Sequence, residues 1–172
     1  MLPENPNKKI SFDNGIFKEI YLGGGCFWGT DARITRTLGV HSTEVGYADG
    51  KTENPTYRDV CHGDTGHVEV VRVKYDTTKI TLKCLLEEFF NIINPTTLNR
   101  QGDDVGVQYR SGIYYTDIQD KEVIEEVVAN EQCKYEESIV TEVKPLENYY
   151  KAEEYHQNYV EKNPGGYCHI KF

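Results

Sequence analysis

The sequence predicts an α+β fold, a two-layer sandwich in which helices pack on a mixed β-sheet and long irregular loops connect the elements. Strands and helices alternate only in part, because two strands come together before the second helix. The expected strands are 17–22, 42–47, 67–75, 112–116 and 139–143. The expected helices are 27–38, 82–93, 119–136 and 149–160. The order of the strands does not follow from this pattern.

The first strand and the first helix are joined by a run of glycines. Residues 17–22 form the strand, and residues 27–38 carry the apolar spacing of a helix. Gly39 is the expected C-terminal cap of that helix, since glycine adopts the left-handed conformation at little cost. A short strand, 42–47, follows.

The clearest strand is 67–75, because its alternate residues share one face of the sheet. These residues are Glu69, Val71, Val73 and Tyr75. The helix 82–93 is amphipathic and turns its leucine and phenylalanine residues inward. The helix 119–136 is strongly charged and has only a narrow aliphatic stripe, so most of its surface is expected to face solvent.

Two long polar stretches, 48–65 and 96–110, interrupt the regular pattern. Loops of this length inside a compact domain are usually functional. Side chains on loops that a rigid sheet holds in place are the usual material of active sites. Polar and aromatic groups gather in these two loops and at the start of the strand 67–75. These three segments are therefore the candidate site segments.

The length of 172 residues fits a single domain, residues 16–172, preceded by a flexible N-terminal arm of residues 1–15. The net charge of −9 argues against a nucleic-acid partner and against an anionic membrane surface. No apolar run approaches the ~20 residues of a membrane span. Residues 1–14 lack the apolar core of a secretory signal. We expect a monomer, because no long apolar face is left over.

The cysteines are odd in number, widely spread and without a CxxC pair, which makes a poor disulfide framework. They are Cys26, Cys61, Cys84, Cys133 and Cys168. Such a set predicts a reducing cytoplasm. The spacing of the histidines with Cys61 matches no standard zinc pattern, so we expect no metal. Cys61 is expected to be structural, and Cys84 and Cys133 belong to no motif.

The segment Gly23–Gly29, GGGCFWG, places Cys26 at the junction of a strand and a helix. A thiol at a helix N-terminus lies near unpaired backbone N–H groups and the positive end of the helix dipole. This environment lowers the pKa of a thiol and favours the nucleophilic thiolate. Two aromatic residues, Phe27 and Trp28, follow directly and can wall the site against water.

Other interpretations of this turn stay open. Glycine-rich turns also bind phosphates, but this one lacks the G-x-G-x-x-G and Gly-Lys-Ser/Thr spacings. Free cysteine is also commonly a small buried hydrophobic residue. A Cys–His hydrolase or acyltransferase would pair Cys26 with His67 or His156 as the base. A redox-sensing or sulfoxide-binding module without turnover is a further alternative.

Five segments in this order resemble the peptide methionine sulfoxide reductase A family. They are GGGCFWG, GYADG, NPTYRDVCHGDTGHVEVV, NPTTLNRQGDDVGVQYRSGIYY and EEYHQNYVEKNPGGYC. The similarity covers about residues 20–168. The combination of GCFWG, GHxE and QYRS is highly specific. Three aspartates depart from the usual pattern: Asp31 replaces Glu, Asp49 replaces Gly and Asp103 replaces Asn.

The resemblance implies reduction of the S epimer of methionine sulfoxide, free or in proteins. The family's nucleophile falls on Cys26 and its carboxyl group on Glu69. Its hydroxyl donors fall on Tyr57 and Tyr109, and its supporting carboxylate on Asp104, although an aspartate there also suits a turn. The chemistry agrees, because attack on the sulfoxide sulfur requires the oxygen to be protonated or stabilised as it leaves. A glutamic acid in an apolar pocket keeps its proton and can donate it.

The resemblance also implies how substrate is bound and how the enzyme is recycled. Phe27 and Trp28 would bind the S-methyl group by apolar and sulfur–aromatic contact. A sulfenic acid condenses with a second thiol to a disulfide, and the family's recycling thiol falls on Cys168, on a glycine-rich tail flexible enough to reach Cys26. Thioredoxin would act as the external reductant, with no cofactor. The chain resembles members with one nucleophile and one resolving cysteine.

Overall fold

The computed structural model describes residues 2–166. Within that range the strands of the main sheet are β1 (Phe17–Gly23), β2 (Val40–Ala48), β3 (Val68–Asp76), β6 (Gly112–Tyr115), β7 (Glu142–Pro145) and β8 (Tyr149–Lys151). They are ordered β7-β6-β1-β3-β2-β8. β6 and β7 are parallel, while the other neighbouring pairs are antiparallel. A mixed sheet with packed helices confirms the predicted α+β class.

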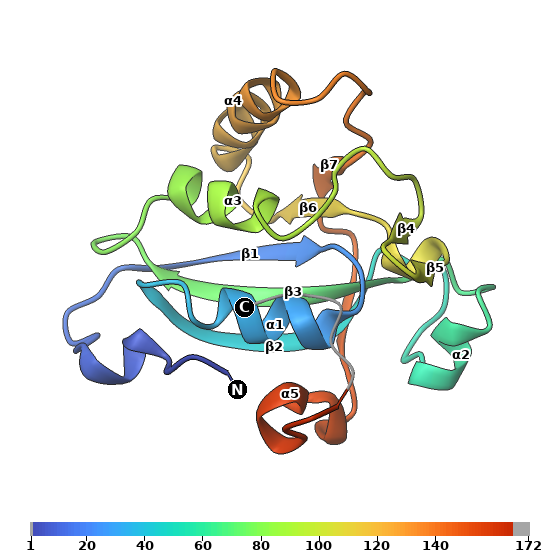
Figure 1. Cartoon of the computed structure of the whole chain (residues 1–172), viewed down its shortest axis with the longest axis horizontal. Coiled ribbons are helices and arrows are strands. Elements are labelled where there is room, and N and C mark those ends of the chain that lie inside the picture. Colours follow the sequence, from blue (N-terminus) through green and yellow to red (C-terminus); the bar gives the residue numbers. More distant parts are fainter. Residues whose placement is uncertain (1, 167–172) are drawn as a thin grey trace.

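The helices lie mainly on one face of this sheet (Figure 1). The α-helices are α1 (Phe27–Ile34), α2 (Tyr57–Cys61), α3 (Leu82–Phe90), α4 (Asp120–Gln132) and α5 (Tyr159–Lys162). The 3-10 helices are η1 (Pro6–Lys9), η2 (Val107–Tyr109) and η3 (Glu154–His156). α1 packs on β2 and β3, and α4 packs on α3 and β6. Two short strands, β4 (Arg100–Gln101) and β5 (Asp104–Val105), form a separate hairpin.

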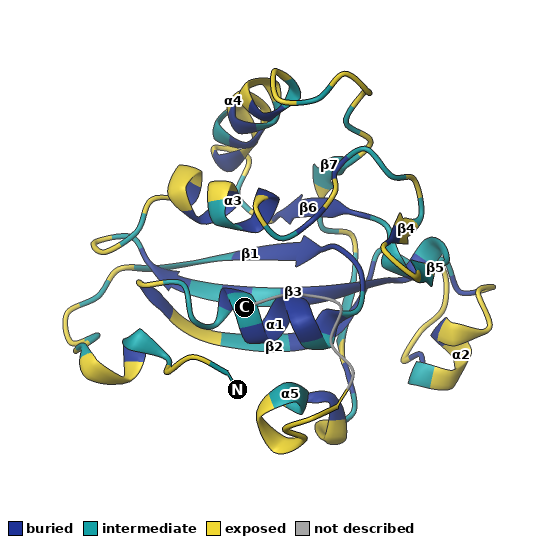
Figure 2. Ribbon diagram, in the orientation of Figure 1, coloured by how far each residue is buried: buried dark blue, intermediate teal, exposed yellow. Residues whose placement is uncertain are grey.

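The main core lies between the sheet and the helices α1, α3 and α4. The second half of β1 and β6 are dark blue in Figure 2, whereas the outer faces of α3 and α4 are yellow. Strand alternation sends Glu69, Val71, Val73 and Tyr75 to the core side, and all four are buried. The predicted shared face of this strand is confirmed. Glu69, the single acidic residue among these four, therefore points toward α1.

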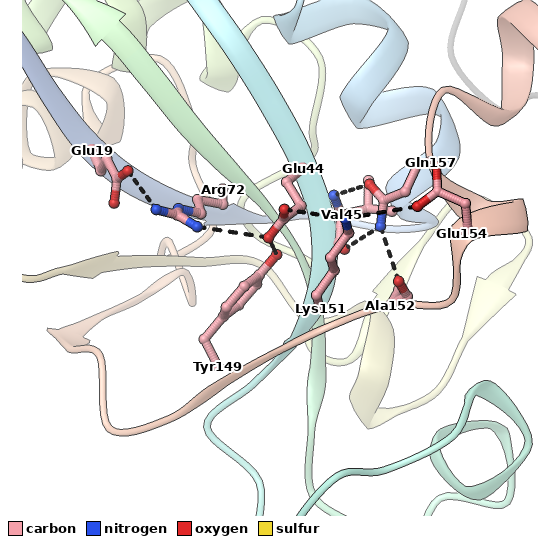
Figure 3. A network of polar contacts seen from close by, with 9 residues as sticks. All are labelled: Glu19, Glu44, Val45, Arg72, Tyr149, Lys151, Ala152, Glu154 and Gln157. Atoms are coloured by element: carbon pink, nitrogen blue, oxygen red, sulfur yellow. Dashed lines mark hydrogen bonds and ion pairs between the residues drawn. The ribbon is translucent and has the colours of Figure 1, made fainter.

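The opposite face of the sheet carries a polar network (Figure 3). Arg72 lies 2.7 Å from Glu19 and 3.7 Å from Glu44. The hydroxyl of Tyr149 donates to Glu44 at 2.8 Å. On the same face, Tyr21, Val70 and Tyr114 form a second, smaller buried cluster with Tyr149 packed against it. The buried acid Glu69 lies on the other face, with the main core.

The N-terminal arm is tied to the end of α1 by Asn7. Its amide donates to the carbonyl oxygens of Thr35 at 3.1 Å and Thr37 at 2.9 Å, and its oxygen accepts from the N–H of Gly39 at 2.9 Å. These bonds satisfy backbone groups that a helix end leaves unpaired. The expected flexibility of the rest of the arm stays a prediction.

Several predicted boundaries shift. α1 ends at Ile34 rather than residue 38, because Thr35–Leu38 form turns before β2. Gly39 has a φ of +98° and accommodates this turn, although it is not the cap of the helix. α4 ends at Gln132, and the strand expected at 139–143 is β7, three residues later.

The helix predicted at 149–160 is wrong. Residues 149–151 form β8, which pairs with β2 and extends the sheet. Between residues 152 and 166 the chain then forms two short helical turns, η3 and α5. Asn158 separates them with a left-handed φ of +52°. Pairing with a distant strand therefore outweighs the local aromatic spacing.

The two long polar stretches are not wholly irregular. The stretch 48–65 contains α2, which begins with a reciprocal capping box between Thr56 and Asp59. The stretch 96–110 contains the β4–β5 hairpin and η2. Within residues 2–166, none of the helices combines the length and the apolar character that crossing a membrane requires.

Asp49, where the resembled pattern has glycine, has a φ of +54° and a fully buried side chain. Its carboxylate accepts from the N–H of Glu147 at 2.8 Å and lies 3.2 Å from the ammonium group of Lys144. We predict that Asp49→Ala lowers the free energy of unfolding by about 2–4 kcal/mol, because both contacts are lost. Asp49→Gly should lose about 1 kcal/mol less, because glycine relieves the left-handed strain.

Urea unfolding monitored by circular dichroism measures both changes. Glu147→Ala is the control, because its side chain is 68% exposed and only its backbone N–H contacts Asp49. That variant should stay within about 0.5 kcal/mol of the parent. Equal stability of Asp49→Ala and Glu147→Ala would contradict the role given to the carboxylate.

Candidate active site

Cys26 lies at the turn between β1 and α1, as the sequence predicts. It is the N-cap residue of α1 and is half-buried. Gly25 before it has a φ of +72°, a conformation that favours glycine. The N–H of Gly25 donates to the carbonyl oxygen of Tyr109 at 3.1 Å. The turn that holds Cys26 is therefore attached directly to η2, which carries Tyr109.

Glu69 lies beside this turn. Its carboxylate accepts the backbone N–H of Phe27, the residue after Cys26, at 3.3 Å. The side chain is only 2% exposed. Burial raises the pKa of Glu69 to about 8, aided by the nearby charge of Asp104 and opposed by the Phe27 N–H. Glu69 therefore keeps its proton at neutral pH and is a hydrogen-bond donor next to a cysteine.

Tyr57 and Tyr109 approach the same place from α2 and η2. Burial raises the pKa of both phenols above their ordinary value, and the charge of Glu69 contributes in each case. The charge of Cys26 also acts on Tyr109. Both hydroxyls therefore remain protonated donors at physiological pH. The nearby thiol of Cys61 also helps to raise the pKa of Tyr57, which places that cysteine beside the site.

The two aromatic residues after Cys26 have different surroundings. Phe27 is buried, with its ring 5.7 Å from Tyr47 and 5.2 Å from His156. The indole N–H of Trp28 donates to Nδ1 of His156 at 2.9 Å. The same indole stacks on Tyr159 at 3.7 Å, with planes 9° apart. The Trp28 ring is thus held at its edge by His156 and on its face by Tyr159, which fixes the orientation of the indole.

The histidines bear on the hydrolase alternative. Both ring nitrogens of His67 are occupied, since Nδ1 accepts from Gly50 at 3.1 Å and Nε2 contacts the carbonyl of Thr52 at 2.8 Å. His156 uses Nδ1 to accept from Trp28, and burial lowers its pKa, with Glu153 opposing. Because Nδ1 of His156 is an acceptor, the neutral ring carries its proton on Nε2, which has no hydrogen-bond partner within the described residues and cannot take a proton from Cys26.

A family model described as peptide methionine sulfoxide reductase matches residues 18–172. The chain belongs to this family. It is 60% identical over 154 residues to the peptide methionine sulfoxide reductase MsrA of Clostridium perfringens, covering 90% of this chain and 98% of that protein. The enzyme is accordingly an oxidoreductase that acts on methionine sulfoxide.

Solved structures of the family show the same fold. The reduced form of Mxr1 from Saccharomyces cerevisiae matches with a TM-score of 0.85 at 40% identity, covering 96% of both chains. The complex of Mxr1 with Trx2 matches with a TM-score of 0.62 at 30% identity, covering 88% of this chain and 91% of that chain. The reductase fold thus extends over nearly the whole described chain.

Two further acidic residues have distinct places, one near Glu69 and one on α1. Asp104, on β5, is close enough for its charge to raise the pKa of Glu69. Asp31, on α1, is buried and has a pKa raised by burial to about 6, against hydrogen bonds from Thr43 and from the backbone of Asn158. Asp31 therefore links the first helix to the segment before α5. Cys168, the expected recycling thiol, lies outside the described residues.

Sequence reasoning missed two residues that contact this group. Tyr47 packs on Phe27 and lies directly opposite Glu69 across the β2–β3 pair. Glu153 accepts hydrogen bonds from Tyr47 and from the backbone of Tyr57. Tyr47 lies in the segment GYADG and Glu153 begins the segment EEYHQNYVEKNPGGYC, and their place in these segments was their only signal. Both act through contacts between distant parts of the chain.

Proposed function

We propose that this reductase converts the S epimer of methionine sulfoxide to methionine by attack of the Cys26 thiolate on the sulfoxide sulfur. The observation that carries the proposal is the protonated, buried Glu69, whose carboxyl group contacts the Phe27 N–H at 3.3 Å, beside Cys26. A nucleophile and an acid are thereby brought together. The choice of epimer rests on membership of the family.

The first step forms a bond between the Cys26 sulfur and the substrate sulfur while the sulfoxide oxygen takes the Glu69 proton. Tyr57 and Tyr109 supply hydrogen bonds to that oxygen, as an oxyanion hole does. The hydroxyl group then moves from the substrate sulfur to the Cys26 sulfur, and the bond between the two sulfurs breaks. The products are methionine and a sulfenic acid on Cys26, so the sulfoxide is reduced by two electrons and the thiol is oxidised by two. The N-terminal end of α1 stabilises the attacking thiolate.

Phe27 and Trp28 are proposed to bind the S-methyl group. The hydrogen bond to His156 and the stack on Tyr159 hold the Trp28 ring in one orientation. An apolar wall of fixed orientation favours one substituent of the sulfur over the other. Sulfur–aromatic contacts of this kind contribute about 0.3–1.5 kcal/mol each. Asp104 is proposed as the supporting carboxylate, acting on Glu69 through its charge.

The second step is proposed to form a Cys26–Cys168 disulfide with release of water, followed by reduction by a thioredoxin dithiol. Support comes from α5, which ends six residues before Cys168 and packs on α1, the helix that follows Cys26. The family member Mxr1 forms a complex with Trx2. Thiols carry all the electrons, so the proposed cycle uses no metal and no organic cofactor.

Oxidised proteins and peptides are the proposed substrates besides the free amino acid. The cytoplasm is the proposed location, because a thioredoxin-coupled thiol cycle and exposed cysteines such as Cys61 and Cys84 suit a reducing compartment. The monomeric state stays a prediction, which analytical ultracentrifugation checks.

Separated sulfoxide epimers test the function directly. With dithiothreitol as reductant, the S epimer of a methionine sulfoxide peptide should be converted to the methionine peptide while the R epimer persists. Conversion of the R epimer would overturn the stereochemical assignment. Absence of any conversion, together with a burst of product from an activated ester, would favour the hydrolase alternative instead.

Cys168→Ser separates the two steps of the cycle. We predict an unchanged yield of one methionine per enzyme without added reductant, because the first step needs only Cys26. Turnover with thioredoxin, thioredoxin reductase and NADPH should fall by at least about 10²-fold, because no disulfide forms for thioredoxin to reduce. NADPH consumption measures the cycle. Equal losses in both assays would contradict the assignment of Cys168 as the resolving thiol.

A further inference from the structure

Glu153 connects the C-terminal segment to two other elements of the site. It lies between β8 and η3 and is half-buried. One carboxylate oxygen accepts the hydroxyl of Tyr47 at 2.9 Å. The other accepts the backbone N–H of Tyr57 at 3.0 Å. These bonds outweigh burial and lower the pKa of Glu153, so the carboxylate is charged when it accepts them.

Tyr57 is held by this segment on two sides. Its N–H lies in the first turn of α2, where backbone donors have no partner within the helix. Thr56 and Asp59 satisfy other donors of that turn through their capping box, and Glu153 satisfies the Tyr57 N–H. The ring of Tyr57 packs on His156, with centroids 4.5 Å apart. The position of the Tyr57 hydroxyl thus depends on a residue 96 positions later in the chain.

The other partner of Glu153 adjoins Glu69. Tyr47 on β2 lies directly opposite Glu69 on β3, so the two side chains share one face of the sheet. Tyr47 itself is fully buried. The charged carboxylate of Glu153 therefore contacts both Tyr47, the neighbour of the proposed acid, and the backbone of Tyr57, a proposed hydroxyl donor.

The segment itself has an anchor that does not depend on Glu153. The side chain of Gln157 accepts from the N–H of Val45 and donates to the carbonyl of Val45, both at 2.9 Å, and also donates to the carbonyl of Ala152 at 3.1 Å (Figure 3). β8 is paired with β2 as well. Removing the Glu153 carboxylate therefore leaves the C-terminal segment attached to β2, while Tyr47 and the backbone of Tyr57 lose their hydrogen-bond acceptor.

We propose that Glu153 is a positioning residue for sulfoxide reduction, which fixes the first turn of α2 so that the Tyr57 hydroxyl reaches the substrate oxygen. This inference rests on the proposed function of Cys26, Glu69 and Tyr57. Glu153 does not touch the reacting atoms. Its effect on the rate passes through Tyr57, and this makes it separable from a general effect on folding.

A double-mutant cycle tests this coupling. Glu153→Ala should lower the single-turnover rate of methionine formation by about 10- to 100-fold, the size expected for a displaced catalytic group. In a Tyr57→Phe background the same substitution should change the rate by less than about 2-fold, because the hydroxyl it positions is already absent. Glu153→Gln should retain most of the rate, since its oxygen accepts the Tyr57 N–H and its amide donates to Tyr47.

Glu154→Ala is the matched control. Its side chain is 80% exposed, its carboxylate lies 3.7 Å from Lys151, and it is the next residue in the chain. This variant should keep the parental rate. Equal losses from Glu153→Ala in the parent and in the Tyr57→Phe background would overturn the proposal, as would equal losses from Glu153→Ala and Glu154→Ala.

Amide hydrogen exchange at Tyr57, followed by NMR, tests the same contact without any activity. The exchange of the Tyr57 N–H should be at least about 10-fold faster in Glu153→Ala than in the parent or in Glu153→Gln, because only the alanine variant loses the acceptor. Unchanged exchange would overturn the positioning role. If no variant, parent included, reduced a sulfoxide, the proposed function would fail while this measurement still decided the role of Glu153.

Discussion

Cys26→Ser is expected to reduce sulfoxide turnover by at least about 10³-fold, to the background of the reductant alone. A serine hydroxyl is not ionised at neutral pH, and it cannot accept the sulfoxide oxygen to form a sulfenic acid. The N-terminus of α1 therefore has no nucleophile to stabilise. The loss is measured with dithiothreitol as the reductant, by quantifying the methionine formed from the S epimer by chromatography.

The same substitution at other cysteines provides the control. Cys84 on α3 and Cys133 at the end of α4 are exposed and lie outside the proposed site. Cys84→Ser and Cys133→Ser should keep the parental rate with dithiothreitol. Mass spectrometry of the purified protein verifies the substitution. More than a trace of activity in verified Cys26→Ser would show that Cys26 is not the nucleophile.

The elements that the sequence predicts well are those whose pattern is local. From Val71 to Tyr75, β3 alternates buried residues with partly exposed charged ones, and α3 repeats leucine and phenylalanine with helical spacing. The Cys26 turn also has a local signal, since glycines precede a helix-forming run. In each case the residues that determine the structure lie within about ten positions of one another.

The failures involve contacts between distant segments. Residues 149–151 have helical spacing but gain backbone hydrogen bonds by joining β2, about 100 positions earlier. The bond between the Tyr57 backbone and Glu153 has no local signal at all. Glu69 lies in a candidate site segment, but its role as the acid came only from the resemblance, because a glutamate at a strand start can also be a surface charge. Its burial beside α1 results from the pairing of three strands.

Glu69→Gln is expected to lower the single-turnover rate by about 10²–10⁴-fold, since an amide cannot donate a proton to the leaving oxygen. The side chain keeps its size and can still accept the Phe27 N–H. In the parent, activity should fall as pH rises through about 8, where Glu69 loses its proton. In Glu69→Gln this alkaline decrease should be absent from the residual rate. A decrease at the same pH in both proteins would assign it to another group.

Glu69→Gln should also become more stable relative to the parent as the pH rises. The pKa of Glu69 rises from 4.5 to about 8 on folding. Its contribution to stability is therefore complete below pH 4.5 and is lost as pH rises through 8. Glutamine has no such dependence, so the melting temperature of Glu69→Gln relative to the parent should increase from pH 5 to pH 8.5.

Glu154→Gln, at an exposed position, should show no such change. Parallel pH dependence in Glu69→Gln and the parent would mean that Glu69 is not kept protonated by burial, and the proposed acid would be lost with it.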